Sequence, residues 1–255
     1  MTGPDGLRAC RHSDGAHPRG TLAIVGRVID IYGGKDPRDL PRYSTAEAAH
    51  YLRLPRATLK SWVHGRVDPN GHRAEAVIRL PGDSALLSFQ NLVEAHVLSA
   101  IRRHHGVSLQ RVRRALRFVE RRMHQQRPLI TAKFQTDGVD LFVDELGKLI
   151  NASSEGQTGI ESALRASLAR VEHDHDGLAS RLFPFVRGEG KEPKVIVVDP
   201  RLSFGKPVVA KTGVPVSVIV GRYRAGEDVA AIAKDYGISV DQTHDAIRTA
   251  IPAAA

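Results

Sequence analysis

The strongest chemical signal in the sequence is a run of arginines between Ile101 and Arg127. This segment holds nine arginines, no lysine and one acid, Glu120, so it carries a balance of +8 out of the chain's net charge of +9. Guanidinium groups bind phosphate oxygens through charge-assisted, often bidentate hydrogen bonds. A solvated helix face normally mixes both signs of charge, and this one does not. The run therefore predicts binding to a polyanion such as nucleic acid.

A second set of cationic and hydroxyl side chains lies between Tyr43 and Val63. Arg56, Thr58 and Lys60 occur there without an intervening acid. A helix that enters a DNA groove lies between two rows of phosphates and must offer hydrogen-bonding groups to base edges. We therefore expect a DNA-reading helix here, with an ordinary helical hairpin as the alternative. The residues expected to contact DNA are Ser44, Thr45, Arg53, Arg56, Thr58, Lys60, Ser61, Arg66, His72, Arg73, Arg113, Arg114 and Arg117.

Residues suited to metal or acid–base chemistry do not form a convincing cluster. His173–Asp176 reads His-Asp-His-Asp, but adjacent ligands on a helix point away from one another, so we expect an exposed polar helix face and no metal site. The twelve histidines are scattered along the chain. A nucleic-acid-processing enzyme, the competing hypothesis, would need convergent carboxylates or a histidine-based site. We therefore expect a protein that is not an enzyme and uses no cofactor.

Length and composition suggest two domains in a reducing compartment. A chain of 255 residues with 42% hydrophobic content can form more than one core, since domains usually hold about 100 to 200 residues. The single cysteine, Cys10, provides neither a disulfide framework nor a thiolate zinc site, which suits the cytoplasm. Eighteen consecutive apolar residues, the minimum for a membrane helix, occur nowhere. Residues 1–20 are polar and are expected to be a disordered tail.

The elements that position the second cationic set read as a helix-turn-helix. Ser44 and Glu47 have the spacing of a capping box, in which each side chain satisfies a backbone N–H of the first turn, so a helix should start there. Pro55 is suited to the first position of a second helix. Leu59 and Trp62 of that second helix are expected to face inward, which leaves its polar residues outside.

A wing is expected after this pair of helices. Residues 75–80 and 84–89 alternate in polarity around the turn Pro81–Asp83 and read as two strands. Phe89–Arg103 then has one apolar stripe at spacings of three and four, which predicts an amphipathic helix. The whole of residues 21–127 is expected to form a winged helix-turn-helix DNA-binding domain.

The middle of the chain is expected to connect two domains or to mediate dimerisation. The arginine helix Leu109–Met123 has an apolar seam that is either core or a subunit contact. Residues 128–151 read as a β-meander with a hairpin turn at Asp137–Gly138. Ile160–Leu182 reads as a further helix, whose apolar face is another candidate dimer contact. These segments make up the expected connecting region, residues 128–186.

The C-terminal part reads as a second helix-turn-helix domain with a different surface. Residues 187–194 are glycine, proline and charge, which is typical of a linker, and residues 195–255 follow as the domain. Its last helix exposes Asp241 and Asp245, whose carboxylates would repel phosphates, so we expect protein contact there. The expected fold class is mainly α with small β-hairpins (α+β), an N-terminal winged helix-turn-helix plus a C-terminal helix-turn-helix domain.

Two stretches resemble parts of a known bacterial family. Residues 199–239 (DPRLSFGKPVVAKTGVPVSVIVGRYRAGEDVAAIAKDYGIS) resemble a small domain, long of unknown function, that is found in VapB-type antitoxins. Residues 43–62 (YSTAEAAHYLRLPRATLKSW) and 88–101 (SFQNLVEAHVLSAI) are similar to the MerR-type DNA-binding half of the same two-domain antitoxins. One departure is Thr212–Pro215, where the family pattern usually has an arginine after the threonine.

The resemblance implies partners. It implies that the C-terminal domain inhibits a VapC-type PIN-domain RNase toxin, whose acidic residues hold magnesium, and that the N-terminal domain binds operator DNA of its own operon. A palindromic operator would require a homodimer. Charge complementarity to the acidic toxin pocket favours Arg201, Lys206, Arg222 and Arg224 as partner-binding residues, and Phe204 is expected to bind the partner with them. The alternative function is a stand-alone MerR-like transcription regulator that senses a small ligand in an apolar pocket.

Overall fold

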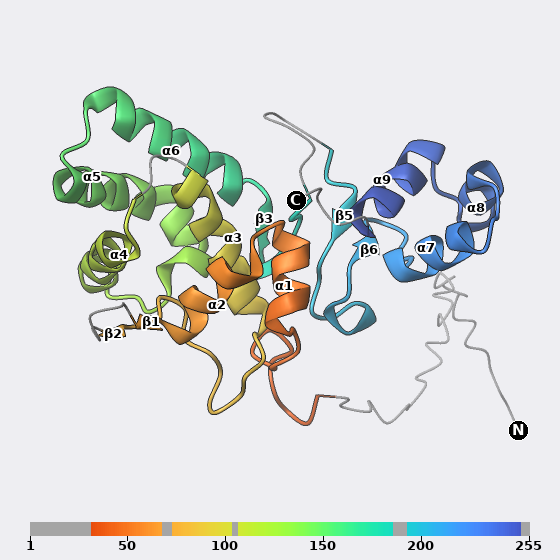
Figure 1. Cartoon of the computed structure of the whole chain (residues 1–255), viewed down its shortest axis with the longest axis horizontal. Helices are drawn as coiled ribbons and strands as arrows, with labels where there is room; N and C mark the ends of the chain where they lie inside the picture. The colour runs from red at the N-terminus through yellow and green to blue at the C-terminus, as the bar shows by residue number, and fades with distance from the viewer. Residues whose placement is uncertain (1–31, 68–72, 104–106, 186–192, 251–255) are drawn as a thin grey trace, which may run out of the picture. The chain divides into compact units, whose positions relative to one another are not determined.

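The computed structural model describes residues 32–67, 73–103, 107–185 and 193–250 (Figure 1). The expected tail and part of the expected linker lie outside these residues, as does His72. Helix α1 spans Thr45–Leu52 and α2 spans Arg56–His64. Ser44 and Glu47 form the expected capping box, and Leu59 and Trp62 are fully buried against α1, so the predicted helix-turn-helix is confirmed.

The wing is present, but one segment earlier than expected. Strands β1 (Arg66–Val67) and β2 (Arg73–Ala74) pair antiparallel directly after α2. The expected strands at 75–80 and 84–89 are wrong, because residues 75–88 form bends, turns and irregular loop and Phe89 begins helix α3. Their apolar side chains instead cover the helix-turn-helix: Ile78 and Leu87 are buried in its core, and Leu87 makes an isolated bridge to Tyr43.

Helix α3 (Phe89–Arg103) is buried around its circumference over most of its length, not along the single stripe that was expected. Its polar residues are paired inside the core, as buried polar groups must be. Asn91 donates to the carbonyl of Arg79 at 2.8 Å, and Glu94 receives two hydrogen bonds from Arg127. Periodicity records only apolar residues, so a helix whose polar side chains are buried in pairs reads as amphipathic.

The expected β-meander at 128–151 is wrong. The segment contains a 3-10 turn, η1 (Pro128–Ile130), a π-helical turn, η2 (Phe134–Gly138), and helix α5 (Val139–Ile150). Gly138 is not a hairpin turn. A Cβ at this position would overlap the Phe134 ring, so the glycine permits close packing within a helix. Helix α5 packs against α4 (Leu109–Met123) on one side and against α6 (Ser154–Leu168) on the other.

The helix expected to reach Leu182 ends at Leu168. Strands β3 (Val171–His173) and β4 (Ala179–Leu182) follow as an antiparallel hairpin. Asp174 accepts hydrogen bonds from the backbone N–H groups of Asp176 and Leu178, which fixes the hairpin turn. It also pairs with Arg38 at 2.6 Å. The His-Asp-His-Asp sequence is therefore a hairpin turn with one paired carboxylate, not the exposed helix face that was expected.

The C-terminal residues form three helices around their own core. Strands β5 (Ile196–Val197) and β6 (Val208–Val209) pair antiparallel, with the 3-10 turn η3 (Ser203–Gly205) between them. Helices α7 (Val216–Arg224), α8 (Val229–Tyr236) and α9 (Val240–Ala250) pack on one another. The expected fold class, mainly helical with small antiparallel hairpins and a helix-turn-helix, is confirmed. Within the described ranges no helix is long and apolar enough to cross a bilayer.

Candidate nucleic-acid interface

The exposed face of α2 carries cations that have no acidic partner among the described residues. Arg56 and Lys60 are exposed, and Arg53 and Arg66 are exposed at either end of the helix. No ion pair with another described residue involves any of these four side chains. Their charges are therefore available to an external polyanion, because no internal carboxylate in the described ranges neutralises them.

The hydroxyl groups predicted to contact DNA differ in the hydrogen bonds that they already form within the chain. Thr58 is half-buried, and its carbonyl accepts the hydroxyl proton of Ser61 at 2.7 Å, which leaves the Ser61 oxygen able to accept a further hydrogen bond. Ser44 is fully used by the helix cap: its N–H and hydroxyl donate to Glu47 Oε2 at 3.1 and 2.9 Å, and its oxygen accepts the Glu47 N–H. Ser44 therefore positions α1, while its neighbour Thr45 is half-buried at the start of that helix.

Glu47 would repel phosphates at the start of α1, but it is neutralised from within the chain. Lys206 Nζ lies 2.6 Å from Glu47 Oε1. Burial alone would raise the pKa of the Glu47 carboxyl, and the hydrogen bonds from Lys206 and Ser44 together lower it. The carboxylate is therefore charged and paired, so its repulsion of an external anion is reduced.

The arginine helix α4 lies beside Glu75, the residue that directly follows strand β2. Arg117 Nη2 lies 2.7 Å from a carboxylate oxygen of Glu75, and Arg113 donates to the Glu75 carbonyl. Burial lowers the pKa of the Arg113 guanidinium. Arg114 is exposed. Arg113, Arg114 and Arg117 were predicted as phosphate contacts. Because Glu75 directly follows Ala74, the last residue of β2, the contacts to Glu75 place helix α4 next to β2.

The remaining arginines of the run divide into two groups. Arg111, Arg121 and Arg122 are exposed on α4 and have no acidic partner in the described parts of the chain, so they extend the cationic surface beyond the predicted residues. The helical spacing of the apolar seam places them outside and could have identified them. Arg127 instead turns inward and binds Glu94 and Gln90 at 2.8 and 2.5 Å. The run is therefore not purely a surface feature.

The second helical pair has a mixed-charge surface. On α9, Asp241 and His244 are exposed, and Arg248 pairs with Asp245 at 3.2 Å. The predicted partner-binding residue Arg222 contacts the carboxylates of Glu227 and Asp235 at 2.5 and 2.7 Å. Of the other predicted partner-binding residues, Arg201, Phe204 and Arg224 are exposed, and Lys206 is held by Glu47.

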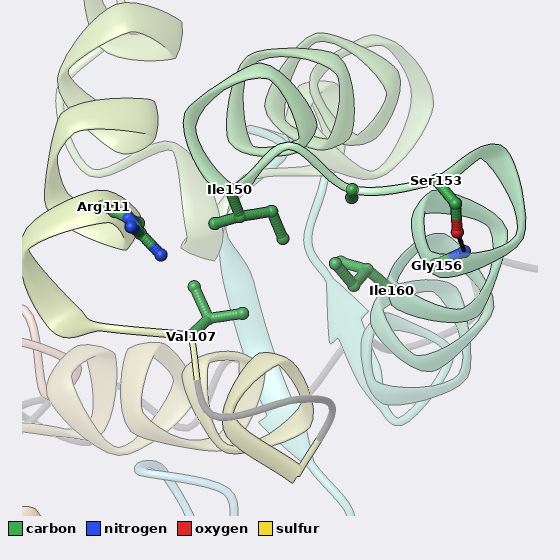
Figure 2. A pocket seen from close by; sticks show the side chains of 7 residues that line it. Val107, Arg111, Ile150, Ser153, Gly156 and Ile160 are labelled. Carbon is green, nitrogen blue, oxygen red and sulfur yellow. Dashed lines mark hydrogen bonds between the residues drawn. The ribbon is translucent and has the colours of Figure 1, made fainter.

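A pocket of about 320 Å³ lies where α4, α5 and α6 meet (Figure 2). Val107, Ile150 and Ile160 point into it, and Arg111 extends from α4 at one side. Ser153 does not face the space as a free hydroxyl, because it accepts the N–H of Gly156 at 3.2 Å and so caps α6. Across the described ranges, no group of three or more histidine, cysteine or acidic side chains could hold a metal ion.

The helix-turn-helix and the family match to it define the class of this protein: a helix-turn-helix DNA-binding regulator. A family model described as a putative DNA-binding HTH domain matches residues 41–116, and one described as a protein of unknown function (DUF433) matches residues 196–249. The two models cover the two segments that carried the resemblance seen in the sequence.

Relatives that match most of the chain occur in Mycobacterium tuberculosis strain H37Rv. The chain is 33% identical over 230 residues to the putative antitoxin VapB45, a match that covers 82% of this chain and 93% of the relative. It is 27% identical over 221 residues to the uncharacterized protein Rv2308, covering 80% of this chain and 88% of that protein. The crystal structure of Rv2018 from M. tuberculosis superposes with a TM-score of 0.61 at 28% identity, and the match covers 82% of this chain and 98% of that one. The chain belongs to the family of two-domain VapB-type antitoxins.

Proposed function

We propose that this protein is the antitoxin of a type II toxin–antitoxin pair that represses its own operon through its N-terminal half and inhibits a VapC-type PIN-domain RNase through residues 195–255. The observation that carries the proposal is the contrast between two similar helical pairs. Helix α2 exposes cations without described acidic partners, whereas α9 exposes Asp241 and pairs its Arg248 with Asp245. Only the first pair has a surface suited to a duplex.

DNA binding would use three neighbouring elements with different tasks. Helix α2 would lie in the major groove, where Arg56 and Lys60 reach base edges or phosphates. The β1–β2 wing and the exposed arginines of α4 would contact the backbone on the side where Glu75 joins them. Phosphate contacts fix the register of the protein on DNA, and base contacts supply specificity.

Inhibition of the toxin needs no catalysis by this chain. A PIN-type RNase holds magnesium with carboxylates, so a cation and a bulky side chain placed at its entrance would block substrate by charge pairing and steric closure. Arg201, Phe204 and Arg224 are exposed and could take this part. Arg222 would first have to break its ion pairs with Glu227 and Asp235, so we propose that it holds this surface in shape and does not contact the toxin.

A homodimer on a palindromic operator remains part of the proposal, but the two apolar stripes suggested for it are not free. The seam of α4, including Val112 and Val119, is buried against α5. The stripe of α6, including Ile160 and Leu164, is buried against α3 and α5. A dimer would therefore form through another surface.

The proposal is tested by expressing the full chain with the PIN-domain protein encoded beside its gene. We expect the two to co-purify, the RNase activity to be blocked in the complex, and the chain to retard its own promoter in a gel shift. Free RNase activity in the presence of excess chain, or equal affinity for promoter and unrelated DNA, would contradict it.

The alternative, a stand-alone MerR-like regulator that senses a small ligand, has one supporting observation. The pocket in Figure 2 combines apolar side chains with Arg111, which suits a small ligand that has an apolar body and one negatively charged group. This alternative is supported if no toxin gene lies beside the gene of this chain and if an aliphatic or aromatic carboxylate found by screening raises the melting temperature of the protein.

A further inference from the structure

The loop between β5 and β6 exposes an aromatic side chain on a strained backbone. Phe204 is 67% exposed, more than any other large hydrophobic residue in the described ranges. Ser203 and Phe204 both have positive φ angles, 45° and 51°. Residues other than glycine rarely adopt this left-handed region, and such strain is characteristic of functional sites. The chain holds a phenylalanine in water at the cost of local backbone strain.

Three interactions hold this loop in place. The buried Tyr43 hydroxyl donates to the Gly205 carbonyl at 2.9 Å. Asp199 accepts the N–H of Arg201 at 2.8 Å at the beginning of the loop, and Lys206 is bound to Glu47 at its end. An exposed side chain on a fixed loop loses little conformational entropy on binding, which is the property of an interface anchor.

A groove adjoins the loop and shares Lys206 with it. Its volume is about 300 Å³, and the described residues that line it include apolar and cationic side chains and no carboxylate. Its lining includes Tyr51, Phe185, Val216, Val220, Lys206 and Arg224. A groove of this composition suits an apolar side chain that has an acidic neighbour.

The surface of the surrounding segment keeps an excess of positive charge. Residues 200–224 contain five cations and no acid. Lys206 and Arg222 are paired with carboxylates from outside the segment, and Arg201, Lys211 and Arg224 are exposed and form no ion pair with a described residue. A partner that carries carboxylates would be favoured, and a cationic partner would be repelled. A DNA duplex could pair with the cations, but its bases are already stacked on one another and leave no free face for an exposed phenylalanine, whereas a protein offers an apolar pocket.

We propose that Phe204 and the adjoining groove form the docking surface for the toxin, which deepens the proposed function and rests on it. Phe204 enters an apolar pocket of the toxin bordered by carboxylates, and the groove takes an apolar side chain of the toxin whose acidic neighbour pairs with Arg224. The surface is continuous, because Lys206 belongs to both the loop and the groove.

The test uses the full-length chain and the PIN-domain protein encoded beside its gene, with affinity measured by calorimetry. We expect Phe204→Ala to weaken binding by about 30-fold or more, the loss typical of an anchor residue, and Arg224→Gln to weaken it several-fold. Leu86→Ala is the matched control, since Leu86 is also an exposed apolar residue (38%) but precedes α3 in the N-terminal half. Promoter binding by each variant reports that it is folded.

The outcomes separate the two proposals. If the unaltered chain does not bind the toxin, the proposed function fails. If it binds and both Phe204→Ala and Arg224→Gln bind equally well, the docking surface is overturned while the function survives. If Phe204→Ala leaves toxin affinity unchanged but weakens binding to promoter DNA, the loop is a nucleic-acid contact and the inference is wrong. Should Phe204→Ala not fold, Phe204→Leu and Phe204→Asp make the same comparison, with the greater loss expected for the carboxylate.

Discussion

The buried hydroxyl of Tyr43 donates a 2.9 Å hydrogen bond to the carbonyl of Gly205, 162 residues further along the chain. Tyr43 immediately precedes the cap of α1, and Gly205 immediately follows the exposed Phe204. Burial strongly raises the pKa of the Tyr43 phenol, so it stays protonated and able to donate. The entry to the DNA-binding helices is thus bonded directly to the loop that we assign to the toxin.

Removing this donor should destabilise the protein. Tyr43→Phe leaves the Gly205 carbonyl without its partner, and we expect the free energy of unfolding to fall by about 1 to 3 kcal/mol. The measurement is urea denaturation of both proteins. Tyr51→Phe serves as the control and should change stability less, because Tyr51 is half-buried and its hydroxyl forms no hydrogen bond with a described residue. Equal stability of Tyr43→Phe and the unaltered chain would show that the hydrogen bond contributes nothing.

Replacing the free cations of α2 should weaken operator binding and its dependence on salt. For Arg56→Ala with Lys60→Ala, we expect the slope of log affinity against log salt to fall by about 2, one unit for each lost phosphate contact. Anisotropy titrations at several salt concentrations measure it. The double variant Lys148→Ala with Lys234→Ala removes the same charge from α5 and α8 and should leave the slope unchanged. Identical slopes in both double variants would remove α2 from the interface.

Glu75 should lower the affinity of the protein for DNA. Its carboxylate pairs with Arg117 and would lie near phosphates if α4 contacts the backbone, whereas Arg113 donates to the Glu75 backbone carbonyl, which Glu75→Ala retains. Glu75→Ala is therefore expected to raise affinity for promoter and for unrelated DNA alike, because phosphate contacts carry no sequence information. Its effect on stability should stay below about 1 kcal/mol, since the ion pair is exposed. Weaker DNA binding by this variant would contradict the placement of α4.

Acid should weaken the fold through the pair of Arg38 and Asp174, whose side chains are only 7% and 11% exposed. Burial raises the pKa of Asp174, but hydrogen bonds from Leu178 and the charge of Arg38 outweigh it, so the folded pKa lies below the ordinary 3.8. A carboxyl with a depressed folded pKa stabilises the fold above its unfolded pKa, and this contribution is lost as pH falls through the folded value.

Asp174→Asn should therefore lower stability at neutral pH by about 1 to 3 kcal/mol and make unfolding less dependent on pH below 3.8. Thermal melts between neutral pH and acid measure both effects. Asp176→Asn, an exposed neighbour in the same turn, is the control. Parallel pH profiles for the unaltered chain and Asp174→Asn would show that this pair does not govern acid stability.

Local chemistry made the helix-turn-helix predictable. The Ser44 and Glu47 capping box needs only residues three apart, and the inward Leu59 and Trp62 follow from helical spacing, so both appear in the structure as expected. The segments whose predicted structure was wrong depend on partners that are distant in the sequence. Residues 75–89 alternate like strands but cover the core beside α2, and Phe134 to Gly138 forms a helical turn because the chain packs tightly there.

The sequence by itself determined the capped start of α1, the excess of arginine, the contrast between the two helical pairs and the family. Each of these depends on the types of residues and on spacings of a few positions. The tertiary structure alone decided which charges are free: it paired Arg127 with Glu94, Arg222 with Glu227 and Lys206 with Glu47. A charge is neutralised by whichever carboxylate lies within a few ångströms, and in a folded chain that partner can be five or 159 residues away.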